Sequence, residues 1–280
     1  MKKSVKILSA ILTLVTLLPT TVFAADKTVN NQVMCGDGDT GIPLSYEEQL
    51  VQIEEDETLT PEQKEIQKEK LTFGEQINQI ERNSGLSRAE KDNKLYRLSG
   101  DLAEPMATSI SLYVFYFKQE TSYYCGPATA RQTIATILNS VVRVPTQSAI
   151  ANDPAFGGVS ASGGTLNATK MRQYINSKAS ANYVEVVNYT SEAMQLCLDR
   201  GLTDGNPPIL RMTGNKGDIW PYTTQGHYLN VSRKINATTY QVTDPYIEYA
   251  NPSITNGKFN VTLSQIYDVV QQHTAKSFWF

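Results

Sequence analysis

Four residues of the types used in cysteine-dependent acyl transfer follow one another along this chain: Gln119, Cys125, His227 and Asp244. The first two lie in FKQETSYYCGPATARQTIATIL, and the last two lie in GHYLNVSRKINATTYQVTDPY. A thiol activated by an imidazole attacks an amide carbonyl, a carboxylate orients the imidazole, and an amide N–H stabilises the oxyanion. This ordered set therefore predicts catalysis through a thioester intermediate.

The sequence after Cys125 predicts that this cysteine begins a helix. Pro127 suits a first helical turn, where its missing N–H leaves no hydrogen bond unmade. The stretch ATARQTIATILNSVV has helical periodicity, and its expected apolar face comprises Ile134, Ile137, Leu138 and Val141. The positive end of a helix dipole favours a thiolate and is expected to lower the pKa of Cys125.

His227 is the expected partner of Cys125. The only other histidine, His273, closes a predicted helix, where a C-capping role is expected. His227 and Asp244 lie at the two open ends of a predicted hairpin, so Asp244 can reach the imidazole and fix its tautomer. Asp218 is a minor alternative orienter, but its predicted loop position gives no contact. Gln119, together with the N–H of Cys125, is the expected oxyanion donor.

Each of these residues has an ordinary structural interpretation when it is taken alone. A cysteine in an apolar helix is usually a packing residue, as we expect for Cys197, and an Asp before Pro, as in Asp244-Pro245, is usually a turn residue. The joint pattern favours catalysis. Trp220, Tyr123 and the loop 157–164 could line a cleft, although packing and loop roles are more common for such residues.

At these motifs the chain resembles the double-glycine (bacteriocin-leader) peptidases of the papain-like superfamily, and more closely their exported stand-alone members. The resemblance rests on QETSYYCGPATA, PPILRM, GHYLNVSRK and VTDPY, and it covers about residues 108–280. It implies a papain-like fold and the roles nucleophile for Cys125, base for His227, orienter for Asp244 and oxyanion donor for Gln119. The leader-processing members are cytoplasmic domains of transporters, so cleavage after Gly-Gly is not carried over.

Residues 1–24 have the pattern of a secretory signal peptide, with three lysines before an apolar stretch and Val22-Phe23-Ala24 at the expected cleavage site. We therefore expect an exported bacterial protein, secreted or held at the cell surface, with no stable membrane span after signal removal. The formal net charge of −3 becomes more negative without those lysines, which argues against nucleic acid as a partner.

The chemistry predicted here needs no cofactor, and no two Cys or His residues have the spacing of a metal site. The chain contains three cysteines, so that if Cys125 is the nucleophile only Cys35 and Cys197 could form a disulfide. Nothing else in the sequence favours that bridge over two thiols.

The order of predicted elements indicates an α+β fold, with helices first and an antiparallel sheet afterwards. Residues 25–45 are expected to be a flexible N-terminus, 46–106 a charged helical hairpin or pro-segment, and 107–280 the peptidase domain. In that domain we expect helices at 166–179, capped by Thr165, and at 191–201 and 263–273. We expect strands at 109–117, 183–189 and 206–212, a hairpin over 227–246 and a last strand from 277.

The segment 46–98 repeats a helix-start pattern at Thr60 and Ser87, each followed three residues later by Gln63 or Glu90. One interpretation is a solvated hairpin that acts as a spacer or docking arm. Another is intramolecular inhibition of a following peptidase domain by residues 46–98.

The sequence thus predicts an exported cysteine peptidase that acts on peptides or proteins. Two alternatives stay open: a cell-wall amidase, endopeptidase or transamidase, which would use the same Cys–His pair, and an exported interaction module without activity.

Overall fold

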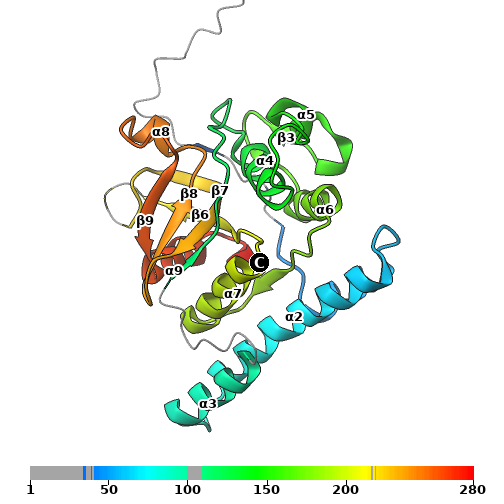
Figure 1. The fold of residues 1–280 in the computed structure, drawn as a ribbon, viewed down its shortest axis with the longest axis vertical. Helices are drawn as coiled ribbons and strands as arrows, with labels where there is room; N and C mark the ends of the chain where they lie inside the picture. The colour runs from blue at the N-terminus through cyan, green and yellow to red at the C-terminus, as the bar shows by residue number, and fades with distance from the viewer. Residues whose placement is uncertain (1–33, 36–38, 40, 100–108, 216, 218) are drawn as a thin grey trace, which may run out of the picture. The chain divides into compact units, whose positions relative to one another are not determined.

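The computed structural model describes residues 34–35, 39, 41–99, 109–215, 217 and 219–280. The predicted signal peptide and Asp218 lie outside these residues. Within them the chain forms a large, mostly antiparallel sheet with helices on both faces (Figure 1). The predicted α+β class is confirmed at this level.

The main sheet has the order β5-β10-β6-β7-β8-β9. Its strands are β5 (Glu185–Val187), β10 (Ser277–Trp279), β6 (Ile209–Gly214), β7 (Thr224–Lys234), β8 (Thr239–Thr243) and β9 (Lys258–Thr262). Two short strands also pair with β7: β1 (Met34–Cys35) is parallel to it and β2 (Ile110–Ser111) antiparallel. β3 (Val159–Ser160) and β4 (Gly164–Thr165) form a separate two-stranded sheet.

Alternate residues of the central strands enter two different cores. One core contains Tyr228 and Trp279 and is covered by α4 (Cys125–Ile137), α5 (Gln147–Asn152) and α6 (Ala168–Ala179). The other contains Leu229 and Phe278 and is covered by α7 (Ser191–Thr203) and α9 (Leu263–Gln272). A sheet whose side chains are apolar on both faces must be covered on both. The short α8 (Ile247–Ala250) and a 3₁₀ turn (Pro154–Phe156) complete the described elements of this region.

Three helices precede this region: α1 (Tyr46–Glu55), α2 (Pro61–Arg82) and α3 (Arg88–Ser99). Both predicted helix starts are confirmed. Thr60 caps α2 in a capping box with Gln63, and Ser87 and Glu90 exchange the equivalent bonds at α3. α1 was not predicted, although Ser45 and Glu48 form a capping box there as well.

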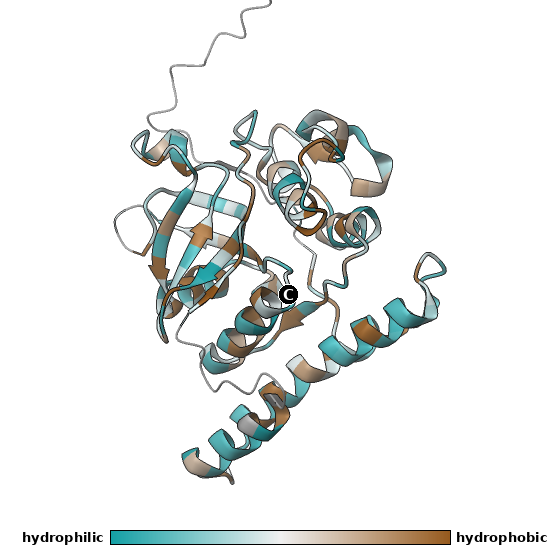
Figure 2. Ribbon diagram, in the orientation of Figure 1, coloured by the Kyte–Doolittle hydropathy of each residue, from teal (hydrophilic) through white to brown (hydrophobic). Residues whose placement is uncertain are grey.

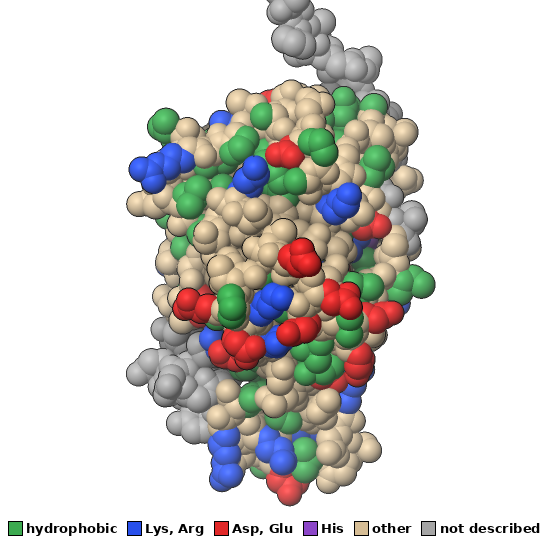
Figure 3. Space-filling model, turned by 90° about the vertical axis from the view of Figure 1, so that its right-hand side faces the viewer, with side chains coloured by type: hydrophobic (Ala, Val, Ile, Leu, Met, Phe, Trp, Pro, Cys, Tyr) green, Lys and Arg blue, Asp and Glu red, His purple; other side chains and the backbone are tan. Residues whose placement is uncertain are grey.

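α1 and α2 pack on the sheet region, so the segment is not the solvated hairpin that one interpretation offered. Ile53 and Ile77 are buried in the same core as Leu229. Polar side chains reach the outer edge of β5, where the Gln49 amide exchanges hydrogen bonds of 3.0 and 3.3 Å with the backbone of Glu185. α2 is nevertheless mostly hydrophilic in Figure 2, and Figure 3 shows side chains of both charges interspersed on one face of the molecule.

Some boundaries differ from the predicted ones. α4 ends at Ile137, because the chain turns at Asn139, which has a positive φ of 45°, and Val141 lies beyond the helix with 44% of its surface exposed. The cap of α6 is Asn167, whose side chain accepts from Lys170 N, whereas Thr165 belongs to β4. The predicted strand 109–117 forms strand structure at Ile110–Ser111, and Leu112 N adds one bond to Ser232 O of β7. The chain then turns to α4, where Phe115 N donates to Thr136 Oγ1.

Lys70 on α2 generates a prediction about how firmly this helix is held. Its ammonium is buried 4.8 Å from the centre of the Phe280 ring, and burial lowers its pKa from 10.5 to about 8. Below pH 8 the buried group is charged and destabilises the fold, and this penalty disappears as the pH rises towards 10.5. We expect Lys70→Met to raise the free energy of unfolding at pH 6 by about 1–3 kcal/mol, and by much less at pH 10.

Urea unfolding of both proteins at the two pH values measures this difference. Lys68→Met is the control, because Lys68 lies two residues away and forms ion pairs with Glu54 and Glu65. An equal gain in both variants would show that the burial of Lys70 is not the cause.

Candidate active site

His227 and Asp244 form a buried pair. Nε2 of His227 lies 2.9 Å from Oδ1 of Asp244, and neither side chain has exposed surface. The same carboxylate oxygen accepts a 2.7 Å bond from the backbone N–H of Tyr246. Since Nε2 faces a carboxylate, we assign the proton to Nε2, which leaves Nδ1 as the basic nitrogen. Among the described residues Nδ1 has no hydrogen-bond partner.

Tyr222, which was not predicted from the sequence, also binds the Asp244 carboxylate. Its hydroxyl donates a 2.5 Å bond to Oδ2 of Asp244, and its ring lies 5.8 Å from that of His227, nearly perpendicular to it. Burial, followed by the charge of Asp244, raises the pKa of Tyr222 well above 10, with a smaller contribution from Cys125. Tyr222 is therefore a neutral donor that holds one carboxylate oxygen while the other holds His227.

The β7–β8 hairpin brings the pair together, as predicted. Asn230 of β7 lies opposite Thr243 of β8, so His227 and Asp244 stand just beyond the paired residues at the same end of the hairpin. Gly257 holds Asp244 from the other side, since its carbonyl accepts from Asp244 N at 2.8 Å. It has a positive φ of 69°, and a Cβ atom there would collide with the Tyr116 ring, so this position requires glycine.

Cys125 is buried at the first residue of α4. Two hydrogen bonds fix α4 along β7: Thr129 Oγ1 donates to the carbonyl of Tyr228 at 2.9 Å, and Asn230 Nδ2 donates to Thr133 Oγ1 at 2.8 Å. One helical turn of about 6 Å thus matches two strand residues of about 6.6 Å. The same spacing, continued one helical turn back from Thr129, brings Cys125 level with Gly226, the residue before His227. This is the end of β7 where the His227–Asp244 pair lies.

The first turn of α4 begins without a side-chain cap from its N-cap residue. Tyr124, the N-cap residue, makes no side-chain capping bond, so the charge of the helix terminus is not compensated by a capping oxygen from that residue. Gly126 is needed for packing, because a Cβ atom there would collide with the hydroxyl of Thr165 on β4. In this Cys-Gly-Pro sequence the cysteine supplies the thiol, the glycine allows the helix to lie close to β4, and the proline lies in the first helical turn.

Gln119 lies next to Asp244 through the backbone, because its N–H donates to the carbonyl of Pro245 at 3.0 Å. Its side-chain Nε2 donates to Thr121 O at 2.7 Å. The Gln147 side chain, which sequence reasoning missed, bonds the residues on either side: it donates to Lys118 O at 2.8 Å and accepts from Glu120 N at 3.0 Å. The four predicted residues therefore come from three segments that hydrogen bonds and the packing of α4 on β7 tie together.

The other predicted residues have structural roles or lie elsewhere. His273 is the C-cap of α9, as expected, and its Nδ1 accepts from Ala275 N at 3.1 Å. Trp220 is buried against Tyr222 and Phe259.

Cys197 is a buried residue of α7, and burial raises the pKa of its thiol. It forms no disulfide, so the bridge to Cys35 that the cysteine count left open is absent.

Comparison of this chain with protein families, with characterised proteins and with solved structures finds no match. Among the described residues, no cluster of three or more His, Cys, Asp and Glu side chains is placed to hold a metal ion. None of the helices in the described ranges combines the length and apolar character that a bilayer span requires.

The contact between Tyr222 and Asp244 predicts a measurable loss of stability. Tyr222→Phe removes the hydroxyl and leaves a buried carboxylate oxygen without its donor. Since hydrogen bonds to charged groups contribute about 1.5–3 kcal/mol, we expect the free energy of unfolding at pH 7 to fall by that amount. Tyr246→Phe is the control in the same ring cluster, because Tyr246 contacts Asp244 through its backbone, which the substitution keeps. Equal losses in the two variants would contradict this role.

Proposed function

We propose that this protein is an exported cysteine peptidase with a papain-like arrangement of helices and sheet. The observation that carries the proposal is the buried His227–Asp244 pair, with Nδ1 of the imidazole unbonded among the described residues, at the end of β7 where α4 begins with Cys125. An imidazole oriented by a carboxylate and placed near a thiol at a helix N-terminus is the arrangement that nucleophilic thiol catalysis uses. The resemblance of the Gln119, Cys125, His227 and Asp244 motifs to double-glycine peptidases supports the same reaction.

In this mechanism Nδ1 of His227 takes the proton of the Cys125 thiol. The thiolate attacks the carbonyl carbon of a peptide bond, and the negative charge moves to the carbonyl oxygen. The N–H of Cys125 and the amide of Gln119 donate to that oxygen. A primary amide nitrogen carries two N–H groups and can therefore serve more than one acceptor.

The intermediate then collapses. The C–N bond breaks, the imidazolium gives its proton to the departing amine, and an acyl-thioester remains on Cys125. Water, deprotonated by His227, attacks the thioester and releases a carboxylic acid and the thiol. Asp244, held by Tyr222 and Tyr246, stabilises the imidazolium in both steps.

The first test measures the alkylation of Cys125 by iodoacetamide from pH 4 to 9, read by mass spectrometry. The proposal predicts that the rate rises below pH 7, whereas an ordinary thiol follows a pKa of about 8.5. His227→Ala and Asp244→Asn should move the rise towards that ordinary value, because the first removes the ion-pair partner and the second favours the wrong tautomer. A wild-type profile that rises only near pH 8.5 would favour an interaction module over an enzyme.

The second test concerns Gln119. Removal of one oxyanion donor lowers kcat by about 10²–10³-fold, so Gln119→Ala should lose activity on that scale on a fluorogenic peptide library, with the pH profile of Cys125 alkylation kept. Gln195→Ala is the matched control, since that amide bonds the carbonyl of Ala237 outside the site. If the wild type releases fragments from purified peptidoglycan and cleaves no peptides, the proposed peptidase function is wrong and a cell-wall hydrolase is favoured.

A further inference from the structure

A polar pocket of about 220 Å³ lies between α6 and the helices that precede the sheet region. α1 and the turn after it contribute Gln52, Ile53 and Asp56, α2 contributes Gln67, and α6 contributes Arg172. Native interiors are close-packed and contain few voids larger than a water molecule. None of the residues that line this pocket belongs to the candidate active site, so the proposed mechanism gives the pocket no role.

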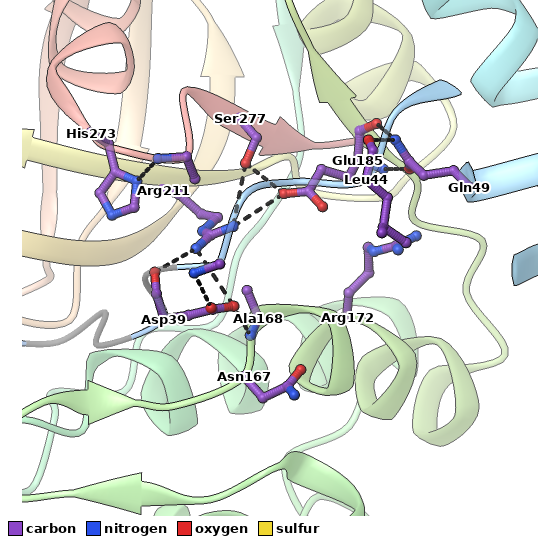
Figure 4. A network of polar contacts seen from close by, with 12 residues as sticks. Asp39, Leu44, Gln49, Asn167, Ala168, Arg172, Glu185, Arg211, His273 and Ser277 are labelled. Atoms are coloured by element: carbon purple, nitrogen blue, oxygen red, sulfur yellow. Dashed lines mark hydrogen bonds and ion pairs between the residues drawn. The ribbon is translucent and has the colours of Figure 1, made fainter. Parts of the chain in front are cut away.

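Arg172 is a buried cation at this pocket that is held by uncharged groups. Its side chain, which extends from α6 in Figure 4, is 3% exposed. Its guanidinium donates to the Tyr183 carbonyl at 3.3 Å and to the Gln52 amide oxygen at 3.2 Å, whereas Glu185 forms its ion pair with Arg211. Burial lowers the pKa of Arg172, although a guanidinium stays charged in a protein. The pocket therefore contains a desolvated positive charge without a carboxylate in contact with it among the described residues.

Two buried donors at the pocket have no acceptor. Among the described residues, neither Nε of Arg172 nor Nε2 of Gln67 has a hydrogen-bond partner. Gln67 is 3% exposed and comes from α2, so the two donors reach the pocket from different helices. A buried donor without an acceptor destabilises the fold. Such donors at one pocket indicate a ligand with oxygen atoms of its own, and a carboxylate matches the planar edge of a guanidinium.

Asp56 supplies a negative charge at the same pocket. It is partly exposed in the turn between α1 and α2, where its Oδ1 accepts from Thr58 N at 2.9 Å. Its charge favours the charged form of Arg172, yet these two described side chains form no ion pair with each other. One cation and one anion that are not paired suit a zwitterion better than a simple anion. The pocket is smaller than the roughly 300–1,000 Å³ of sites for drug-sized ligands, so the ligand must be small.

We propose that this pocket binds a free α-amino acid, with its carboxylate at Nε of Arg172 and Nε2 of Gln67 and its ammonium towards Asp56. Ile53 and Leu59 give the pocket apolar side chains that can contact the carbon atoms of the ligand. A bound amino acid would contact α1, α2 and α6 together, and would therefore stabilise the packing of the helical segment on the sheet region. This inference does not rest on the proposed peptidase function, because binding is measured without hydrolysis.

The experiment measures the binding of each standard L-amino acid to the full chain by isothermal titration calorimetry. Acetate, inorganic phosphate and ethylamine are probes that carry charge of one sign only. Because each lacks one of the two charged contacts, we expect at least one amino acid to bind about tenfold or more tightly than all three. If no amino acid binds, or if acetate or phosphate binds as tightly as the best amino acid, the inference is overturned.

Two variants test the residues that carry the inference. Arg172→Lys keeps the charge and loses the planar fork, and Gln67→Met removes the amide donor. Each should weaken binding about tenfold to a hundredfold. Gln79→Met is the matched control on the same helix, because the exposed Gln79 amide bonds Glu75 at 3.0 Å outside the pocket. Wild-type affinity in Gln67→Met, or an equal loss in Gln79→Met, would contradict the assigned contacts.

Gln67→Met also separates binding from folding. Since the Gln67 amide nitrogen has no acceptor among the described residues, its removal should leave the ligand-free protein at least as stable as the wild type in urea. A variant that keeps its stability and loses the amino acid supports the binding site. A ligand-free Gln67→Met protein that is less stable than the wild type would show that the amide serves the fold, and would overturn its role as a ligand donor.

Discussion

β7 is a buried strand with polar side chains, and the structure around it follows from the need to satisfy them. Its buried polar residues each find a partner from a different direction: the carbonyl of Gly226 for Thr224, Asp244 for His227, Thr133 for Asn230, the carbonyl of Gln241 for Ser232 and Asp199 for Lys234. A buried polar group without a partner costs about 1–3 kcal/mol, and a charged one more. The register of α4, β8 and α7 on this strand is therefore set by specific bonds as well as by apolar packing. The candidate site lies near two of these bonds, His227 to Asp244 and Asn230 to Thr133.

The same arrangement explains which features the sequence could predict. Local signals were sufficient for the starts of α2 and α3, where a hydroxyl and an acid or amide three residues later act within one turn, and for the β7–β8 hairpin, which brings Asp244 to His227. Ser45 and Glu48 carried the same signal for α1. Tyr222 gave no signal, because its contact with Asp244 depends on the path of the loop before β7, and nothing in the residues around it indicates that path.

Long-range pairing also limits prediction. The C-terminal strand β10 lies between β5 and β6, both of which are distant from it in the sequence. The spacing of the strands along the chain could not predict this order. Gln147 likewise reaches back to Lys118 and Glu120 from α5. These contacts determine where Gln119 lies, so the sequence could identify the residue type suited to an oxyanion but not the contacts that hold it.

α1 and α2 cover the outer edge of β5, which has no neighbouring strand on that side among the described residues. An edge strand exposes unpaired backbone groups that invite association, and proteins commonly cover it. Here side-chain amides do so: Gln49 bonds Glu185, and Asn78 donates to the carbonyl of Val187 at 3.3 Å. The buried Ile77 and Phe73 of α2 add apolar contacts, each contributing about 1.5–3 kcal/mol when fully buried. These helices are thus part of the folded unit rather than an independent arm.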